Sequence, residues 1–555
     1  MGVIPPVSVP DRRTVLRSGL AAAALGVVGA ATGCTAQPPS SPARHHLIGP
    51  GSPQVAAAEA ARHATGGTVL AGVAPEAGHI DLGGPVVPTW TNGGQIPGPE
   101  IRVRKGQVLQ ALLVNQLPVE TTVHWHGVAI RNDMDGVPGM TQAPVPAGRE
   151  HTYRFAVAGP GTYWYHPHVG VQLDRGLYGP LIVEDPAETA GYEHDWTVVL
   201  DDWIDGTGYT PDQVLAALRQ GMTGMGMAAA SPSPSPMTSD MSGMPMPSGS
   251  PSMNMTSPAA SPSSGMSGMS SGPTGPSPVM PRARSSLLGG DAGDVRYPYY
   301  LINGRVRGAP RTFTARPGQR ARIRFINAAA DTSFRVALGG HRMTVTHTDG
   351  YPVVPARADA LLIGMGERYD VQVTLGDGVF PLTALAEGKN STALALIRTG
   401  FGEPPPPAIR PAEFGGALAH YGLLRATPSA RLAARGPDVT YRLKLTGGMA
   451  RYDWGINGHA FDMSRPGALQ FLISQGQRVR VVFANTTTMY HPMHIHGHTF
   501  ALGPAGPRKD TVIVRPGQQV ACDFDAANPG QWMTHCHNLY HAPQGGMMAT
   551  LSYQT

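Results

Sequence analysis

Near its C-terminal end the chain carries a cysteine between two histidines, His535-Cys536-His537, followed by His541 and Met547. Two imidazoles, one thiolate and a weakly bound thioether are the ligands of a blue-copper electron-transfer site. Successive side chains of a β-strand point to opposite faces. If Cys536 faces one metal, His535 and His537 therefore face the other side together and can bind a second metal site. This spacing predicts an electron relay between two sites.

A repeated unit occurs three times along the chain. A Gly-Gln pair is followed, nine residues after its glycine, by an asparagine, and the residues between them are typical of a strand. An Asn-Gly pair, which favours a tight turn, precedes each unit. Three homologous β domains are therefore predicted. The glycine-to-asparagine spans are 106–115, 318–327 and 476–485, the strand runs are 108–114, 321–326 and 479–484, and the turns are Asn92-Gly93, Asn303-Gly304 and Asn457-Gly458.

Histidine pairs occupy matching positions in the first and third units, where the second unit has apolar residues. Each pair is a His-X-His sequence, and residues i and i+2 of a strand share a face, so its two imidazoles lie side by side. Eight such imidazoles between domains one and three would suit transition metals rather than Mg²⁺ or Ca²⁺. Nine residues after the three asparagines stand His124, Val336 and His494, and eighteen residues after Gly148, Gly366 and Gly517 stand His166, Ala384 and His535.

The length and composition favour an all-β protein. The chain has 555 residues, which suggests about three domains, and it contains 71 glycines and 54 prolines but only 14% charged residues. The net charge of +5 is small and no basic run occurs, so we expect no nucleic-acid partner. With only three cysteines in the chain, we expect no disulfide scaffold, and Cys522 is predicted to be a small buried hydrophobe.

Residues 1–34 are predicted to be a targeting segment. Arg12-Arg13 precedes an apolar run, 19–31, that is too short to span a bilayer, and the pattern resembles a twin-arginine export signal. We therefore expect a periplasmic, cell-envelope or extracellular protein. Residues 31–34 resemble a lipobox with Ala in place of Leu, and two outcomes stay open: lipidation of Cys34, which would be the only membrane contact, or ordinary cleavage. Residues 35–67 are predicted to be a polar spacer.

Four histidine motifs carry a resemblance to a known family. Two of them lie in the first domain, and two lie in the third. They look like the four copper signatures of three-domain multicopper oxidases of the laccase and bacterial cuprous oxidase type. The resemblance extends from about residue 68 to residue 555, and the motifs occupy residues 124–127, 161–168, 491–497 and 535–541.

This resemblance implies three consecutive cupredoxin-like Greek-key β-barrel domains and about four copper ions per chain, one of type 1, one of type 2 and two of type 3. We expect domain one over residues 68–190, a second domain without copper ligands over 191–402, and domain three over 403–555. Eleven of the 21 histidines, such as His498, lie outside the motifs and are assigned to surface or core positions. The implied ligands are His491, Cys536, His541 and Met547 for type 1 copper, His124 and His494 for type 2 copper, and His126, His166, His168, His496, His535 and His537 for the type 3 pair.

The axial ligand of type 1 copper departs from the family pattern. In the family it usually follows the cysteine by ten positions, which here is Gly546. A one-residue insertion would make Met547 the axial ligand, with Met548 as the alternative. Members of this family take up electrons at the histidine that corresponds to His541, so we expect His541 near the domain surface.

In this family the type 2 and type 3 ions together form a trinuclear cluster, and dioxygen reduction also needs a proton donor near it. Asp135 matches the family's proton-relay acid, and the alternative is a turn residue before Gly136. A second acid that some members carry is replaced here by Ala542. The resemblance implies that electrons pass from a reductant through Cys536 to the trinuclear cluster, where dioxygen is reduced to water.

A methionine-rich insert is expected early in domain two, at about residues 221–283. Half of the chain's 24 methionines fall here among Ser, Pro and Gly, and such low-complexity sequence is typical of disorder. Thioethers are soft ligands that suit Cu(I), so we interpret the insert as a copper-capture segment, with an inert linker as the alternative. The candidate ligands are Met222, Met225, Met227, Met241, Met244, Met246, Met253, Met255, Met266 and Met269.

The leading hypothesis is an extracytoplasmic multicopper oxidase, a monomer, that oxidises Cu(I) with dioxygen and contributes to copper tolerance. Laccase-type oxidation of phenols and aromatic amines is the alternative, and Fe(II) is a further candidate reductant. A non-catalytic copper-sequestering protein is the alternative from another class. A copper nitrite reductase is a weaker alternative, because it would need neither the four His-X-His pairs nor an additional domain without copper ligands.

Overall fold

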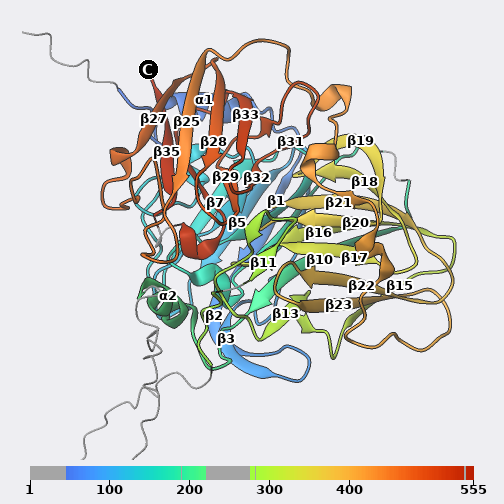
Figure 1. Cartoon of the computed structure of the whole chain (residues 1–555). Coiled ribbons are helices and arrows are strands. Elements are labelled where there is room, and N and C mark those ends of the chain that lie inside the picture. Colours follow the sequence, from blue (N-terminus) through green and yellow to red (C-terminus); the bar gives the residue numbers. More distant parts are fainter. Residues whose placement is uncertain (1–45, 189–190, 221–275, 282, 543–545) are drawn as a thin grey trace, which may run out of the picture. The chain divides into compact units, whose positions relative to one another are not determined.

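Strands make up most of the fold (Figure 1), and their pairing repeats one arrangement three times. The computed structural model describes residues 46–188, 191–220, 276–281, 283–542 and 546–555; the predicted export signal and the ten candidate methionines of the insert lie outside these ranges. In the first sheet of each copy, one strand pairs in parallel with a second, and the second pairs antiparallel with a third. These strands are β1 (Thr68–Val73), β5 (Val108–Val114) and β7 (Glu150–Ala156); β10 (His194–Trp203), β16 (Arg320–Asn327) and β21 (Arg368–Thr374); and β25 (Val439–Thr446), β28 (Arg478–Asn485) and β33 (Gln519–Asp525).

The second sheet of each copy also repeats. Its first strand pairs in parallel with a second, which is followed by two antiparallel neighbours. These strands are β4 (Ile101–Arg104), β9 (Gly179–Glu184), β8 (Gly161–His166) and β6 (His124–His126); β15 (Arg311–Thr314), β23 (Ser391–Arg398), β22 (Val379–Ala386) and β17 (Phe334–Leu338); and β27 (Gln470–Ser474), β35 (Met548–Gln554), β34 (Gln531–Cys536) and β29 (His491–Ile495).

The other elements extend or connect these sheets, and the described residues contain two α-helices. The all-β prediction is therefore confirmed, as are the three predicted strand runs, which lie within β5, β16 and β28. The remaining elements are α1 (Pro53–Ala60), α2 (Pro211–Arg219), β2 (Pro75–Asp81), β3 (Val86–Asn92), β11 (Arg284–Ser285), β12 (Gly290–Asp291), β13 (Tyr299–Ile302), β14 (Arg305–Val306), β18 (Met343–Thr348), β19 (Tyr351–Ala358), β20 (Ala360–Ile363), β24 (Leu418–Ala419), β26 (Gly455–Ile456), β30 (Phe500–Ala501), β31 (Arg508–Lys509), β32 (Thr511–Val514) and the short 3₁₀ helices 132–134, 172–175, 412–415, 421–423, 428–430, 466–468 and 539–541.

The three copies share one cross-strand register at the landmark positions. His124 lies opposite His166, and His494 lies opposite His535. In the middle copy the same places are taken by apolar residues, which also lie opposite each other: Val336 and Ala384. The spacing predicted from glycine and asparagine landmarks therefore corresponds to one conserved pairing of two strands.

The segment expected as a spacer is, in its described part, packed onto the folded body. Pro53 opens α1, and the Ser52 hydroxyl accepts a hydrogen bond from Val55 N, which caps the helix. Ile48 N donates to the Tyr553 carbonyl at 2.8 Å, which ties this segment to the last strand. The composition resembled a linker because α1 has only one buried side chain and therefore little amphipathic pattern.

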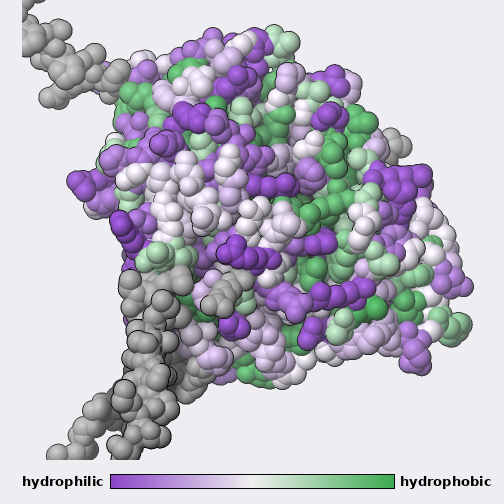
Figure 2. All heavy atoms as spheres, viewed as in Figure 1, coloured by the Kyte–Doolittle hydropathy of each residue, from purple (hydrophilic) through white to green (hydrophobic). Residues whose placement is uncertain are grey.

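Large aromatic side chains fill the core that runs through the three copies, and Trp125, Trp164, Trp203, Trp454 and Trp532 are all fully buried. On the face shown in Figure 2, hydrophilic and hydrophobic residues are interspersed. None of the helices in the described ranges combines the length and apolar character needed to cross a membrane.

Candidate metal centre

Eight histidines from the first and third copies meet in one buried cluster. β6 carries His124 and His126, while each of the other three pairs lies at the end of its strand. Seven of the eight share groups whose ligand atoms lie within 4.8 Å of one another, and the ring of His537 lies against those of His126 and His166. Rings from the two copies stack in pairs: His124 on His496 and His126 on His494, each with centroids 3.9 Å apart. The cluster thus unites the residues that the sequence assigned to the type 2 and type 3 sites: His124, His126, His166, His168, His494, His496, His535 and His537.

Backbone carbonyls fix the orientation of several of these rings. The Nδ1 atoms of His124, His166, His494 and His535 lie 2.8 to 2.9 Å from carbonyl oxygens, so each Nδ1 carries the proton and donates. For His124, His166 and His494 the other nitrogen, Nε2, is buried and has no hydrogen-bond partner among the described residues. A buried acceptor without a partner is costly, and bare nitrogens aimed into one cavity suit metal ions.

His126 is oriented the other way round. Its Nε2 lies 3.1 Å from Asp510 Oδ1 and 3.2 Å from Thr511 Oγ1, and its Nδ1 is buried without a partner. Both nitrogens of His537 lack partners among the described residues. The donor set therefore fits copper, because imidazole nitrogens are common ligands of this metal.

Burial lowers the pKa of seven of these imidazoles and so favours the neutral form that metal binding requires: His126, His166, His168, His494, His496, His535 and His537. Removal from water lowers the pKa of His535 to about 3. The same cause, together with the neighbouring imidazoles, holds the pKa values of His166, His168 and His496 well below their usual range. Neutral nitrogens are thus available for metal at all moderately acidic and neutral pH values.

A second constellation lies on the other face of β34. His491 Nδ1 is 3.6 Å and His541 Nδ1 is 3.8 Å from Cys536 Sγ, and the two Nδ1 atoms are 3.3 Å apart. A metal in the centre of a trigonal His₂Cys set would have bonds of about 2.0 Å to nitrogen and about 2.3 Å to sulfur. Such bonds require a nitrogen–sulfur separation of about 3.7 Å and a nitrogen–nitrogen separation of about 3.5 Å. The triangle therefore already has the dimensions of a type 1 copper site.

Outer partners hold both imidazoles in this orientation. Thr487 Oγ1 lies 2.8 Å from His491 Nε2, and Asp294 Oδ2 lies 2.8 Å from His541 Nε2. With Nε2 engaged, Nδ1 of each ring faces the sulfur. The pKa of the Cys536 thiol is raised, mainly because the thiol is buried, so a bound metal would be needed to stabilise the thiolate.

The packing of the two candidate axial methionines differs. Met547 lies in the main core with Cys536, and its carbonyl accepts a hydrogen bond from Cys536 N. Met548 lies opposite His535 in β35 and packs with Met533 in a separate apolar cluster. This arrangement favours Met547 as the axial thioether.

His541 differs from the expectation of a place near the surface. Its side chain is fully buried, and the Trp454 ring lies with its centroid 4.1 Å away. The sequence could not show this, because Asp294 and Trp454, which cover the imidazole, come from distant parts of the chain.

Asp135 is buried between two of the clustered histidines. Its Oδ2 lies 2.9 Å from His496 Nδ1, and its own carbonyl accepts from His124 Nδ1. Its Oδ1 has no hydrogen-bond partner among the described residues, although His124 Nδ1 lies 3.2 Å away in poor geometry. Asp135 thus holds two of the clustered imidazoles, and its Oδ1 stays without a hydrogen-bond partner among the described residues.

Sequence reasoning missed Asp510 and Arg368. Asp510 contacts His126, and the buried guanidinium of Arg368 donates to both of its carboxylate oxygens at 2.7 and 2.6 Å. Burial alone would raise the pKa of Asp510, but Arg368 holds it well below its usual range. The one available signal was a charged run, Arg508-Lys509-Asp510, directly before the apolar strand β32.

Two other expectations concern residues outside the clusters. His498 is a satisfied core residue, since its Nε2 lies 2.7 Å from the Tyr553 hydroxyl and its Nδ1 lies 3.0 Å from a carbonyl oxygen. Cys522 is fully buried, as predicted.

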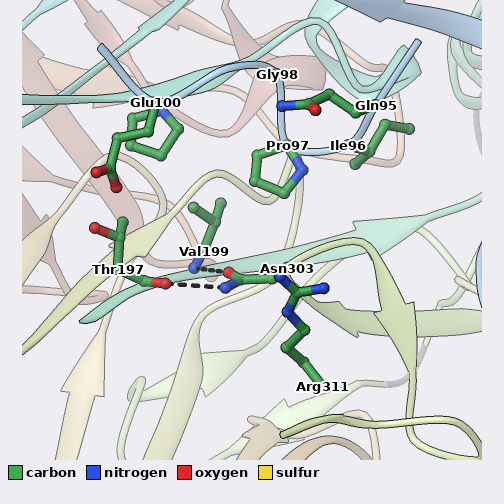
Figure 3. A pocket seen from close by; sticks show the side chains of 10 residues that line it. Gln95, Ile96, Pro97, Gly98, Glu100, Thr197, Val199, Asn303 and Arg311 are labelled. Atoms are coloured by element: carbon green, nitrogen blue, oxygen red, sulfur yellow. Dashed lines mark hydrogen bonds between the residues drawn. The ribbon is translucent and has the colours of Figure 1, made fainter. Parts of the chain in front are cut away.

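An open pocket of about 310 Å³ lies apart from the histidine clusters, since none of the clustered histidines lines it. In this pocket the Asn303 side chain donates a hydrogen bond to the Thr197 carbonyl and accepts one from Val199 N (Figure 3).

Comparison with known proteins gives the class to which this fold and these clusters belong. Family models described as multicopper oxidase match residues 76–188, 282–401 and 434–555. The structure of Fet3p, a multicopper oxidase that functions in iron import, superposes with a TM-score of 0.67 at 20% identity and covers 88% of this chain and 90% of that one. Structural neighbours of this kind support the three cupredoxin-like domains.

Three curated relatives cover most of the chain. Multicopper oxidase MmcO of Mycobacterium tuberculosis is 45% identical, over 98% of this chain and 97% of its own length. A copper resistance protein A homolog of Pseudomonas syringae pv. tomato is 27% identical, over 84% and 89%. Laccase-2 of Botryotinia fuckeliana is 26% identical, over 84% and 78%.

The chain belongs to the multicopper oxidase family. It is therefore a copper-dependent oxidoreductase that uses dioxygen as the acceptor and a reductant as the substrate.

Proposed function

We propose that the protein couples the one-electron oxidation of Cu(I) to the four-electron reduction of dioxygen to water and so contributes to copper tolerance outside the cytoplasm. The observation that carries the oxidase chemistry is the covalent link between the two clusters. Cys536 belongs to the triangle with His491 and His541, while its neighbours His535 and His537 belong to the eight-histidine cluster.

The residues would hold about four copper ions. His491, Cys536, His541 and Met547 would hold type 1 copper, which would accept single electrons from the reductant. The other eight histidines would hold the type 2 and type 3 ions, which supply dioxygen reduction when bound. The chain itself orients these ligands and buries them away from water.

Asp135 is proposed to move protons at the eight-histidine cluster. Its partnerless Oδ1 can accept a proton, while Oδ2 stays on His496 Nδ1. Replacing Asp135 with Asn keeps the shape but removes the base, so oxygen uptake should fall about 10²- to 10⁴-fold and lose its normal pH profile. If the variant keeps its copper and its wild-type pH profile, the relay lies elsewhere.

The oxidase proposal is tested by copper content and absorption. Purified full-length protein should bind about four copper ions and show a strong thiolate-to-copper band. Oxygen uptake with Cu(I) as the reductant should follow. A protein that binds copper but takes up no oxygen with any reductant would instead be a sequestering protein.

Cu(I) as substrate is supported by the copper resistance relative and by the methionine-rich insert. A deletion of the insert should stop at residue 275. Met280 N donates to the Asp294 carbonyl at 2.7 Å, and the Asp294 carboxylate contacts His541, so the residues around Met280 support the copper triangle and are kept. A second variant keeps the length of the insert and replaces the ten candidate methionines with Ser, which separates the loss of thioethers from the loss of chain length. Both variants should lose apparent Cu(I) affinity and keep phenol oxidation; unchanged Cu(I) kinetics would refute the capture role.

Laccase-type oxidation of phenols and aromatic amines is the second candidate, which the laccase relative favours. Side-by-side steady-state kinetics decide between the two: a larger kcat/KM for a phenol than for Cu(I) in the wild-type protein would make the laccase activity the main one.

Export by the twin-arginine route is proposed from residues 1–34. Replacing Arg12 and Arg13 with Lys should retain the protein in the cytoplasm, and replacing Cys34 with Ala should release it from membranes if Cys34 is lipidated. Cell fractionation measures both outcomes.

A further inference from the structure

A turn of the copper-free second domain lies against the clustered histidines. Residues 364–367 connect β20 to β21, and Gly366 has a left-handed φ of +82°. A Cβ atom at Gly366 would lie 2.8 Å from His537 Cδ2 and 3.1 Å from His126 Cε1. The backbone of this turn is therefore part of the wall that surrounds two of the proposed type 3 ligands.

The equivalent turns of the other two domains have no such role. Gly148 and Gly517 occupy the same landmark position, eighteen residues before a histidine pair, and have φ values of +70° and +71°. A Cβ atom at either glycine would meet nothing within 4 Å. Only the second domain has its turn against the metal ligands.

The turn also delivers Arg368, whose guanidinium joins all three domains. It donates to the carbonyl of Thr162 in domain one, to the carbonyl of Gly366 in domain two, and to both carboxylate oxygens of Asp510 in domain three. The side chains of Arg368 and Asp510 are fully buried. A buried carboxylate without this partner would be costly, so the arginine fixes the place of Asp510.

Asp510 in turn orients one imidazole from each flanking domain. Its carboxylate lies 3.1 Å from His126 Nε2, and its carbonyl accepts from His494 Nδ1 at 2.9 Å. These contacts leave His126 Nδ1 and His494 Nε2 as the bare nitrogens. The position of Arg368 is thus transmitted to two ligands that lie in different domains.

We propose that the second domain positions the trinuclear copper ligands: the Gly366 turn confines His126 and His537, and Arg368 sets His126 and His494 through Asp510. This inference rests on the proposed trinuclear site. Arg368 and Gly366 act as positioning residues, since neither supplies a metal ligand. Their loss should weaken copper retention by about 10- to 100-fold at the trinuclear site and leave type 1 copper in place.

The first experiment compares Gly366→Ala with Gly148→Ala in the full-length protein. Both changes place a Cβ at a left-handed turn position, but only the first would press on histidines. Copper content, the thiolate band and electron paramagnetic resonance of type 2 copper are measured after dialysis against a chelator. Gly366→Ala should keep the thiolate band and lose trinuclear copper, while Gly148→Ala should match the wild type.

The second experiment compares Arg368→Met with Arg322→Met. Arg322 is also buried in domain two and donates to Asp370 and Glu188, but to none of the copper ligands. Selective loss of trinuclear copper in Arg368→Met alone supports the inference. Wild-type copper content and type 2 resonance in both Gly366→Ala and Arg368→Met would overturn it. A wild-type protein without trinuclear copper would refute the proposed function instead.

Discussion

Replacing Asp294 tests how strongly its buried hydrogen bond to His541 contributes to copper binding at the proposed type 1 site. Asp294 Oδ2 lies 2.8 Å from His541 Nε2, and both side chains are almost fully buried. Removing the carboxyl group with Asp294→Ala leaves Nε2 without its partner and frees the ring to turn. A buried group left unpaired costs about 1–3 kcal/mol, which corresponds to about 5- to 150-fold weaker copper binding at this site.

Asp294→Asn separates hydrogen bonding from charge. The amide oxygen can still accept the Nε2 proton, so Nδ1 keeps facing Cys536, and we expect a loss of less than about tenfold. Asp291→Ala is the control for charge, because Asp291 lies in the same segment, is only half-buried and acts on His541 through its charge, whereas the hydrogen bond to Nε2 comes from Asp294.

The assay is a chelator titration of copper-loaded protein, followed by the thiolate-to-copper band. The proposed type 2 and type 3 ions would serve as an internal reference, since the described contacts of the Asp294 carboxylate include none of their ligands. Wild-type retention of the band in Asp294→Ala would show that the hydrogen bond does not hold His541. Equal losses in the Ala and Asn variants would show that charge, rather than the acceptor, matters.

Three further outcomes are expected. Cys536→Ser should abolish the thiolate band and leave the trinuclear copper in place, as measured by copper content; a surviving band would contradict the assignment. Met547→Leu should raise the reduction potential of type 1 copper, whereas Met548→Leu should leave it unchanged, and each swap should cost less than about 1.5 kcal/mol of stability; the reverse order would make Met548 the axial ligand. Burial lowers the pKa of His498 to about 4, so the unfolded chain binds its proton at a higher pH than the folded chain does, and His498 destabilises the fold as the pH falls below about 6.5. When the pH is lowered from 8 to 5, the free energy of unfolding of His498→Gln should therefore fall by about 2 kcal/mol less than that of the wild type. Urea titrations measure this difference, and the same pH dependence in both proteins would contradict it.

The histidines that the structure brings together could be found from the sequence, because their signal is local and repeated. A fixed distance from a turn glycine to a strand position is set by strand geometry, so His166 and His535 could be aligned without any contact information. The alternation in β34 likewise separated Cys536 from its two neighbours.

The partners of these ligands could not be predicted in the same way. Asp294 and Arg368 belong to the domain without ligands, and they reach His541 and Asp510 across domain boundaries. Charged residues at such separations leave no pattern in one sequence. The burial of His541 was missed for the same reason, because the side chains that cover it come from elsewhere.

The shared register of β6 with β8 and β17 with β22 has a consequence for how such a protein can change. Val336 and Ala384 already face each other as His124 and His166 do. At these positions the histidine-bearing and apolar copies therefore share one strand register and differ in their side chains. A duplicated domain could lose its metal by a few substitutions and keep its shape, which would free its loops to brace the sites of its neighbours.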